Sequence, residues 1–329
     1  MRDAFVRALM AIARLDERVM LLTGDLGFGV LAPFAETFPD QFLNVGVAEQ
    51  NMTGVATGLA LEGRIVFTYS IGNFPTLRCL EQIRNDVCYH EANVKIVCIG
   101  GGFSYGPLGI SHHATEDLAI MRVLPHMQVM APGDLTETVF ITQLAYKTPG
   151  PCYLRLGRGG EAKIHHNLKE VNLGQAIPLF PRGEVAFLTT GGILFNAIKA
   201  REILDGQGTT VSLHSIPSLQ PLDHELIRHL AKTSELIVTI EEHSIIGGLG
   251  GAVAEVLAEF PGPKPPLMRL GLRDGFSCEV GDQEYLRQVY GLCPAGIANQ
   301  VNKAFAPYKK KANVCLIKSD SSIQGAIMR

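Results

Sequence analysis

Apolar residues along the chain gather in short continuous runs that are separated by longer amphipathic stretches. The runs are about 5–7 residues long, rich in Val, Ile and Leu, and most end on Gly, Pro or a polar residue. They are VMLLTG, IVFTYS, VKIVCIG, MQVMAP, CYLRLG, VAFLTTG, TVSLHSI and LIVTIEE. Uninterrupted apolar runs of this length are typical of parallel strands that are buried on both faces.

Helices are predicted between these runs. They cover residues 4–15, 51–61, 76–90, 118–123, 135–147, 193–207, 223–233 and 251–260. Regular strand–helix alternation predicts an α/β fold with two doubly wound domains and mostly parallel sheets. A polar segment broken by Gly and Pro separates the two halves. We therefore expect domains at 1–157 and 185–307, joined by a linker at 158–184 and followed by a tail at 308–329.

Composition narrows the functional classes. Of the 329 residues 47% are hydrophobic and 19% are charged, and the net charge of −3 gives no electrostatic basis for binding nucleic acid or an anionic membrane. The 7 cysteines are odd in number and widely spaced, so they predict neither a disulfide framework nor a zinc site. The first residues resemble a signal peptide, but Asp3 interrupts them and no small-residue cleavage site follows. We expect a cytoplasmic chain.

One acidic residue stands out between an apolar run and a small-residue helix. In FLNVGVAEQNMTGVATGLALEG, residues 42–63, Glu49 follows the predicted strand directly. An acid at this place is often only a helix cap. However, the small residues around it would let another molecule approach, and the carboxyl end of a strand is where α/β domains bind ligands. The pattern alone leaves both interpretations open.

Other polar and aromatic residues also follow predicted strands, and each has an ordinary structural explanation. Asp25 in GDLGFG fits a glycine turn, whereas an aromatic such as Tyr69 or Phe74 fits the core. The adjacent His112 and His113 have no carboxylate or Cys at a favourable spacing, so no metal site is predicted.

The order of the motifs is more specific than any single motif. DQFLNVGVAEQNMTGVATGLALEG closely resembles the pyrimidine-domain motif of the transketolase family of thiamine-diphosphate enzymes. LLTGDLG, FAETFPDQF, LEQIRNDV, GISHHATEDLAIMRVLPHMQVMAPGD and CYLRLGRGG are similar to further family segments in the same order. TIEEHSIIGGLGGAVAEVL resembles the family's C-terminal-domain motif. The resemblance covers nearly all of residues 3–307.

This resemblance implies roles around the cofactor. Glu49 matches the catalytic Glu that hydrogen-bonds N1′ of the cofactor's aminopyrimidine and favours the imino tautomer. Asp25 would lie near the cofactor's rings. Gly72 stands where transketolases carry a ring-stacking Phe, so we expect Phe74, or otherwise Tyr69, to replace it.

It also implies roles around the substrate. His112 matches the family's active-site His, which faces the donor carbonyl and handles protons, and His113 would support it. Arg158, and less closely Arg155, matches an arginine that holds an anionic substrate group. Leu108 stands where relatives carry an Asp that binds a hydroxyl, so a deoxy, branched or otherwise modified substrate is expected.

The family's diphosphate and metal signature, GDG followed by NN, does not occur in the sequence. The resemblance therefore implies the C-terminal subunit of a split transketolase, which transfers a two-carbon ketol unit from a ketose or ketose phosphate to an aldehyde. An N-terminal partner would share the thiamine diphosphate, bind Mg²⁺ and complete an α2β2 assembly. The alternatives are a 2-oxo-acid dehydrogenase beta subunit, a 1-deoxyxylulose-5-phosphate synthase activity and a non-catalytic scaffold subunit.

Overall fold

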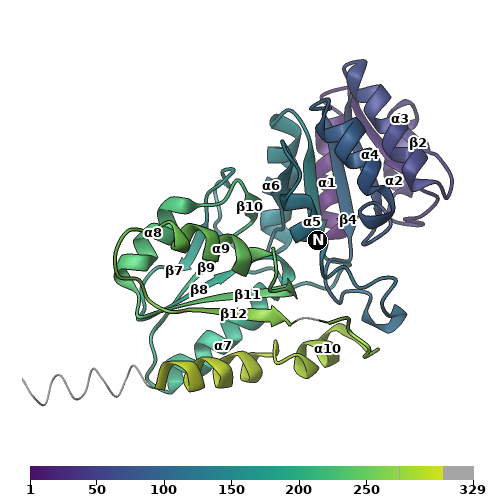
Figure 1. The fold of residues 1–329 in the computed structure, drawn as a ribbon. Helices are drawn as coiled ribbons and strands as arrows, with labels where there is room; N and C mark the ends of the chain where they lie inside the picture. Colours follow the sequence, from purple (N-terminus) through teal and green to yellow (C-terminus); the bar gives the residue numbers. More distant parts are fainter. Residues whose placement is uncertain (274, 307–329) are drawn as a thin grey trace, which may run out of the picture.

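The computed structural model describes residues 1–273 and 275–306, which form two sheets flanked by helices (Figure 1). The first is a seven-stranded sheet with the order β10-β5-β6-β4-β3-β1-β2. Its strands are β1 (Val19–Thr23), β2 (Phe42–Asn44), β3 (Ile65–Ile71), β4 (Val94–Ile99), β5 (Gln128–Met130), β6 (Cys152–Leu156) and β10 (Ser218–Gln220). All neighbours pair in parallel except β10, which pairs antiparallel with β5.

The second sheet has five strands in the order β12-β11-β8-β9-β7. They are β7 (Ile177–Phe180), β8 (Val185–Thr189), β9 (Val211–Ser215), β11 (Leu236–Ser244) and β12 (Leu267–Leu272). Only the edge strand β7 runs antiparallel to its neighbour. The predicted α/β fold with mostly parallel sheets is thus confirmed. The strand β7 lies inside the segment that was predicted to be a linker.

Helices follow most strands and cover both sheets. They are α1 (Arg2–Ala13), α2 (Ala32–Thr37), α3 (Glu49–Leu61), α4 (Leu80–Gln82), α5 (Asp117–Arg122), α6 (Leu135–Lys147), α7 (Leu194–Gly206), α8 (His224–Thr233), α9 (Leu249–Ala258) and α10 (Gln283–Val289), and residues 294–306 are also helical. The helix predicted over 76–90 forms as α4 between a 3₁₀ turn, η2 (Leu77–Cys79), and a π-helical turn, η3 (Ile83–Cys88).

The apolar runs become strands because both of their faces are covered. On one face of the first sheet, Phe5 of α1 and Ile141 of α6 pack with Leu21 and Leu154. On the other face, a cluster continues from Met52 of α3 into the helices of the second sheet. Burial of this kind contributes about 25 cal/mol per Å² of apolar surface and accounts for the near-absence of polar residues in β1, β4 and β8.

The register of the first sheet brings its strand ends to one edge. Thr23 at the end of β1 pairs with Asn44 at the end of β2, and Ile99 at the end of β4 pairs with both Ile71 and Leu156. Parallel strands that end together place the loops after them side by side. This edge positions the residues described below.

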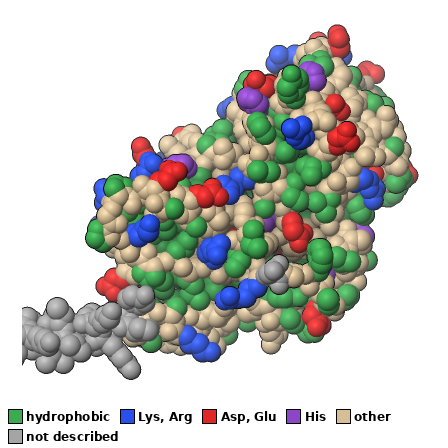
Figure 2. Space-filling model, viewed as in Figure 1, with side chains coloured by type: hydrophobic (Ala, Val, Ile, Leu, Met, Phe, Trp, Pro, Cys, Tyr) green, Lys and Arg blue, Asp and Glu red, His purple; other side chains and the backbone are tan. Residues whose placement is uncertain are grey.

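In the described part of the chain, no helix has both the length and the apolar character needed to cross a membrane. On the face drawn in Figure 2, acidic and basic side chains are interspersed over both halves, with hydrophobic patches between them. The predicted tail at 308–329 lies outside the described residues.

Candidate active site

Glu49 is the first residue of α3 and is only 3% exposed. A turn between β2 and α3 carries it there, in which Gly46 has a positive φ of 74° and donates its N–H to Asn44 Oδ1 at 3.0 Å. Arg78 Nη1 donates to Glu49 Oε2 at 2.7 Å. Its other oxygen, Oε1, accepts no hydrogen bond from the described residues. One oxygen of a buried carboxylate is therefore held, and the other is left for a ligand.

Asp25 lies in the loop after β1, next to the Glu49 carboxylate, and is hydrogen-bonded to the end of β2. Its backbone is in the left-handed region (φ 58°), its N–H donates to Asn44 Oδ1 at 3.0 Å, and Asn44 Nδ2 donates to its Oδ1 at 2.9 Å. A Cβ on the preceding Gly24 would lie 3.5 Å from the Cγ of Glu49. The loop after β1 therefore packs directly against Glu49, with Asp25 exposed beside it.

A line of ring contacts runs from Arg78 across the strand ends. The Arg78 guanidinium lies over the Phe74 ring at 4.6 Å, and Phe74 meets His112 edge-on at 5.2 Å. His112 lies 6.0 Å from Tyr105, and the Arg158 guanidinium lies over Tyr105 at 5.3 Å. We call these residues, together with Glu49 next to Arg78, the site row. Its members are Glu49, Arg78, Phe74, His112, Tyr105 and Arg158.

The charges along the site row differ from one end to the other. Burial, and then the charge of His113, lower the pKa of His112, so its imidazole is neutral at neutral pH. Ser111 Oγ lies 3.0 Å from its Nδ1 and fixes the ring's orientation. A carboxylate, a neutral imidazole and two arginines thus share one edge, which suits proton transfer on an anionic substrate.

Comparison with known proteins identifies the family of this chain. Residues 1–160 match the description "Transketolase, pyrimidine binding domain", and residues 174–297 match "Transketolase, C-terminal domain". The chain is 34% identical over 286 residues to one of the subunits of the apulose-4-phosphate transketolase of Actinobacillus succinogenes, covering 87% of this chain and 92% of that protein. The chain belongs to the transketolase family.

Two further relatives are similar to this transketolase-family chain over most of its length. The 6-deoxy-6-sulfo-D-fructose transketolase subunit SqwH of Clostridium sp. is 38% identical over 295 residues, which is 89% of this chain and 90% of that one. A solved structure of a split gene transketolase, an inactive beta4 tetramer, superposes with a TM-score of 0.83 at 36% identity, covering 93% and 97% of the two chains. The predicted membership among C-terminal transketolase subunits is confirmed.

The structure brings most of the predicted site residues together, but Tyr69 is not among them. It is 2% exposed, and its ring stacks on Phe5 of α1 at 6.3 Å within the core of the sheet. A ring buried on both sides has no free face for a cofactor, so the structure does not support a stacking role for Tyr69. Of the two aromatics predicted to stack on the cofactor, Phe74, which is half-buried, is the one that lies at the site.

His113 points away from the site row. It is 1% exposed, donates from Nε2 to the carbonyl of Gly106 at 3.0 Å, and meets Phe103 edge-on at 5.1 Å. Its side chain therefore shapes the loop that carries its neighbour His112 and does not reach toward a substrate.

Arg155 is also absent from the site row. Its Nε donates to Asp117 Oδ2 at 2.8 Å, and its Nη2 donates to the carbonyls of Ala114 at 2.8 Å and Glu242 at 3.0 Å. Both members of the ion pair are buried. The structure gives Arg155 a role between the two sheets in place of the predicted substrate contact, whereas Arg158 is exposed at the site.

Sequence reasoning missed two members of the site row, Arg78 and Tyr105. Arg78 follows the predicted strand as one of several arginines in the sequence, and its partner Glu49 is 29 residues away, so no local pattern marked it. Tyr105 lies in GGFSYGPLGISHH, where only the histidines carried a family signal.

A group outside the site row has the composition of a metal centre. Ligand atoms of Asp134, Glu137 and His165 lie within 4.8 Å of one another. The carboxylate oxygens already accept hydrogen bonds, however: Asp134 from the N–H groups of Glu137, Ile164 and His165, and Glu137 from Gly133 N and from His165 Nε2. The group therefore works as a helix cap that fastens residues 164–165 to α6.

Proposed function

We propose that this chain is the C-terminal subunit of a split transketolase. It transfers a two-carbon ketol unit from a ketose or ketose phosphate to an aldehyde acceptor. The observation that carries the proposal is the site row, in which a buried carboxylate and a neutral imidazole stand on either side of a half-buried aromatic ring. The family membership makes thiamine diphosphate the cofactor that such a row serves.

The residues present fit the pyrimidine end of that cofactor. Glu49 keeps Oε1 free of hydrogen bonds within the described residues, and Phe74 keeps part of its ring exposed beside it. Glu49 would hold the pyrimidine nitrogen, Phe74 would contact its face, and Asp25 would lie beside them. When bound, thiamine diphosphate supplies the carbon nucleophile of the reaction.

The side chains of this chain would orient the cofactor, transfer protons and bind the substrate. Glu49 offers the Oε1 of its buried carboxylate to the pyrimidine nitrogen, and Arg78 holds that carboxylate in place through Oε2. His112, neutral and oriented by Ser111, can donate a hydrogen bond or a proton to an oxygen of the donor sugar. Arg158 offers a planar guanidinium to an anionic end of the substrate.

Exposed apolar residues support the dependence on a partner. Val47, just before α3, is 75% exposed, and Leu61, the last residue of α3, is 60% exposed; a Cβ added to Gly54 or Gly58 on the same helix would meet open space. Exposed apolar patches beside a buried functional group mark interaction surfaces. We propose that an N-terminal subunit covers this face, binds the diphosphate and Mg²⁺, and forms an α2β2 assembly with this chain.

The loop before His112 supports a particular substrate class. Leu108 is 55% exposed and Ile110 is 50% exposed, so the rim of the site offers apolar surface where a hydroxyl would need a hydrogen-bonding partner. We propose a donor with an anionic end, held by Arg158, and a deoxy, branched or modified carbon facing Leu108. The apulose phosphate and sulfofructose in the names of two relatives are substrates of this kind.

Co-expression with the N-terminal subunit tests the proposal. The purified pair is titrated with thiamine diphosphate and Mg²⁺ by calorimetry, and ketol transfer is then measured from apulose 4-phosphate, 6-deoxy-6-sulfofructose and a simple ketose phosphate. Cofactor binding followed by ketol transfer is expected. Release of CO₂ from a 2-oxo acid would instead indicate a dehydrogenase beta subunit. A pair that binds no cofactor would indicate a scaffold subunit.

A further inference from the structure

The loop that carries His112, residues 102–115, is closed at its base by two backbone hydrogen bonds, and we call this base, formed by residues 102–103 and 114–115, the neck. Gly102 N donates to the carbonyl of Ala114 at 2.8 Å, and Ala114 N donates back to Gly102 at 3.1 Å. Strand β11 of the second sheet ends against this neck, where Ser244 N donates to the carbonyl of Thr115 at 2.8 Å. The two halves of the molecule therefore meet where the loop begins and ends.

The side chain of Glu242, also on β11, contacts the neck through Phe103. It is 3% exposed, and its Oε1 accepts from Phe103 N at 2.6 Å and from Gln283 Nε2 at 2.8 Å. Gly102 has a φ of 64°, and a Cβ there would lie 2.4 Å from Glu242 Oε1. Only a glycine lets the carboxylate approach this closely.

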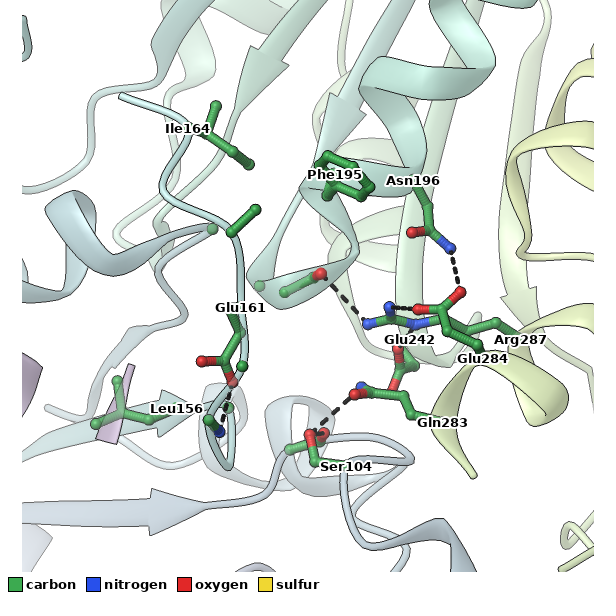
Figure 3. A pocket seen from close by; sticks show the side chains of 18 of the residues that line it. Ser104, Leu156, Glu161, Ile164, Phe195, Asn196, Glu242, Gln283, Glu284 and Arg287 are labelled. Atoms are coloured by element: carbon green, nitrogen blue, oxygen red, sulfur yellow. Dashed lines mark hydrogen bonds and ion pairs between the residues drawn. The ribbon is translucent and has the colours of Figure 1, made fainter. Parts of the chain in front are cut away.

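Charge makes this contact strong. The Nε of Arg287 donates to Glu242 Oε2, and Arg287 is itself buried and also bonded to Glu284 and to the carbonyl of Gly192. An ionised acceptor strengthens the hydrogen bond from a buried N–H, and the adjacent guanidinium balances its charge. Figure 3 shows Glu242, Arg287 and Gln283 converging, with Ser104 of the loop facing Gln283 at 3.4 Å.

Polar contacts, and not packing alone, hold this side of the neck. Glu242, Arg287 and Ser104 border a cavity of about 400 Å³ between the two sheets (Figure 3). A cavity wall lacks the close-packed neighbours that would otherwise restrain it. Loss of the Glu242 carboxylate would therefore leave Phe103 N without its acceptor and let this side of the neck shift toward the cavity, while Arg155 still holds the carbonyl of Ala114 on the other side.

The neck is connected to His112 by a short series of contacts. The buried ring of Phe103 meets His113 edge-on at 5.1 Å, and His113 Nε2 donates to the carbonyl of Gly106 at 3.0 Å. The His112 N–H donates to the carbonyl of Gly109 at 2.9 Å. A shift at Phe103 would move the backbone that presents His112.

We infer that Glu242 is a positioning residue for His112, through which the second half of the chain sets the geometry of the active site. Glu242 does not touch the substrate. The inference rests on the proposed function, because His112 handles substrate protons only there. It gives Glu242, in the C-terminal-domain segment TIEEHSIIGGLGGAVAEVL, a task that the cofactor chemistry does not require.

The test uses the complete complex with the N-terminal subunit. Glu242→Gln replaces one carboxylate oxygen by an amide NH₂ group, so a donor faces either Phe103 N or Arg287 Nε. Arg287→Lys is a second variant, which keeps the positive charge but loses the several N–H groups of the guanidinium. Glu284→Gln is the matched control, because Glu284 also binds Arg287 but its side chain is 64% exposed and its recorded partners within the described residues are Arg287 and Asn196. Hydrogen exchange of residues 102–115 and kcat per bound cofactor are measured for each.

We expect Glu242→Gln to speed exchange at the neck about tenfold. It should also lower kcat by about 10- to 100-fold, the range that a small misplacement of a reacting group produces. The dissociation constant for thiamine diphosphate should stay unchanged, because the residues that contact the cofactor lie outside the loop. Glu284→Gln should leave all three quantities at wild-type values.

Exchange at the wild-type rate in both Glu242→Gln and Arg287→Lys, or faster exchange with unchanged kcat, would overturn the inference. A purely structural role would lower the active fraction and the melting temperature but leave kcat per bound cofactor intact. A wild-type complex without ketol transfer would overturn the proposed function. The exchange measurement would then still decide whether Glu242 holds the loop.

Discussion

Replacing Glu49 by Gln separates its chemical role from its structural one. The substitution keeps the size of the side chain but removes the charge and the ability to exchange a proton. Loss of positioned proton transfer costs about 10²–10⁴ in rate, so kcat of the complex should fall at least about 100-fold. That fall corresponds to roughly 2.7 kcal/mol in the activation barrier.

The structure predicts a much smaller effect on stability. The partner of Glu49, Arg78, is 46% exposed, so its released guanidinium is solvated by water. A half-exposed ion pair contributes up to about 1 kcal/mol, and the charge at the N-terminus of α3 contributes a similar amount at most. The two contributions total at most about 2 kcal/mol, and about 1 kcal/mol shifts the melting temperature by roughly 2–4 °C in a chain of this size class, so it should fall by no more than roughly 4–8 °C.

The assay compares Glu49→Gln with Glu225→Gln in the assembled complex. Glu225 lies in the first turn of α8 and is exposed, so its replacement removes a similar charge at a helix N-terminus away from the site. Ketol transfer, cofactor affinity and melting temperature are measured for both. A Glu49→Gln complex that retains more than about a tenth of wild-type kcat would refute the proton-transfer role.

Three further predictions concern other parts of the chain. Phe74→Ala should weaken cofactor binding about tenfold by calorimetry, because a stacked ring contributes roughly 0.5–1.5 kcal/mol beyond its buried area; unchanged affinity would contradict its place at the site. Arg158→Ala should raise the KM of the anionic donor without changing the urea midpoint of unfolding. Arg155→Ala should instead lower the unfolding free energy by about 3–5 kcal/mol, because it leaves the buried carboxylate of Asp117 unpaired. Equal effects of the two variants on stability would contradict the separate roles given to Arg158 and Arg155. Burial alone would lower the pKa of His165, but the hydrogen bond and charge of Glu137 outweigh it and raise that pKa. The stability that this pair adds should be fully present below the ordinary His pKa of about 6.5 and lost as pH rises through the raised value, so the difference in urea unfolding between wild type and His165→Gln should shrink with rising pH.

Local patterns predicted the strands and most helices, but not how short polar segments pair. SLQ, residues 218–220, has no apolar run, yet it forms β10 and extends the first sheet from the second half of the chain. Similarly, the predicted linker contains β7, whose edge position tolerates Pro178 because only one side of the strand pairs. These pairings join residues far apart in sequence, so no local signal encodes them.

The candidate site was likewise predicted only in part from the sequence. Family resemblance identified Glu49, His112 and Arg158, and the structure places all three in the site row. The resemblance preferred Phe74 but left Tyr69 open, because both lie near the end of the same apolar run. The difference is burial: Tyr69 points into the core against Phe5, and Phe74 lies beyond the end of β3.

The sequence by itself determined which residues stand at strand ends, because alternation of apolar runs and helices is a local property of the chain. Only the tertiary structure decided which of those ends face one another. The parallel register brings Arg78 to Glu49 and Arg158 to Tyr105, and the packing of the two sheets brings Glu242 to the loop of His112. Hydrogen bonds and ring contacts act over a few ångströms in space, whatever the separation along the chain. The site row therefore exists only once the first sheet has formed, and the Glu242 contact only once the two sheets have packed together.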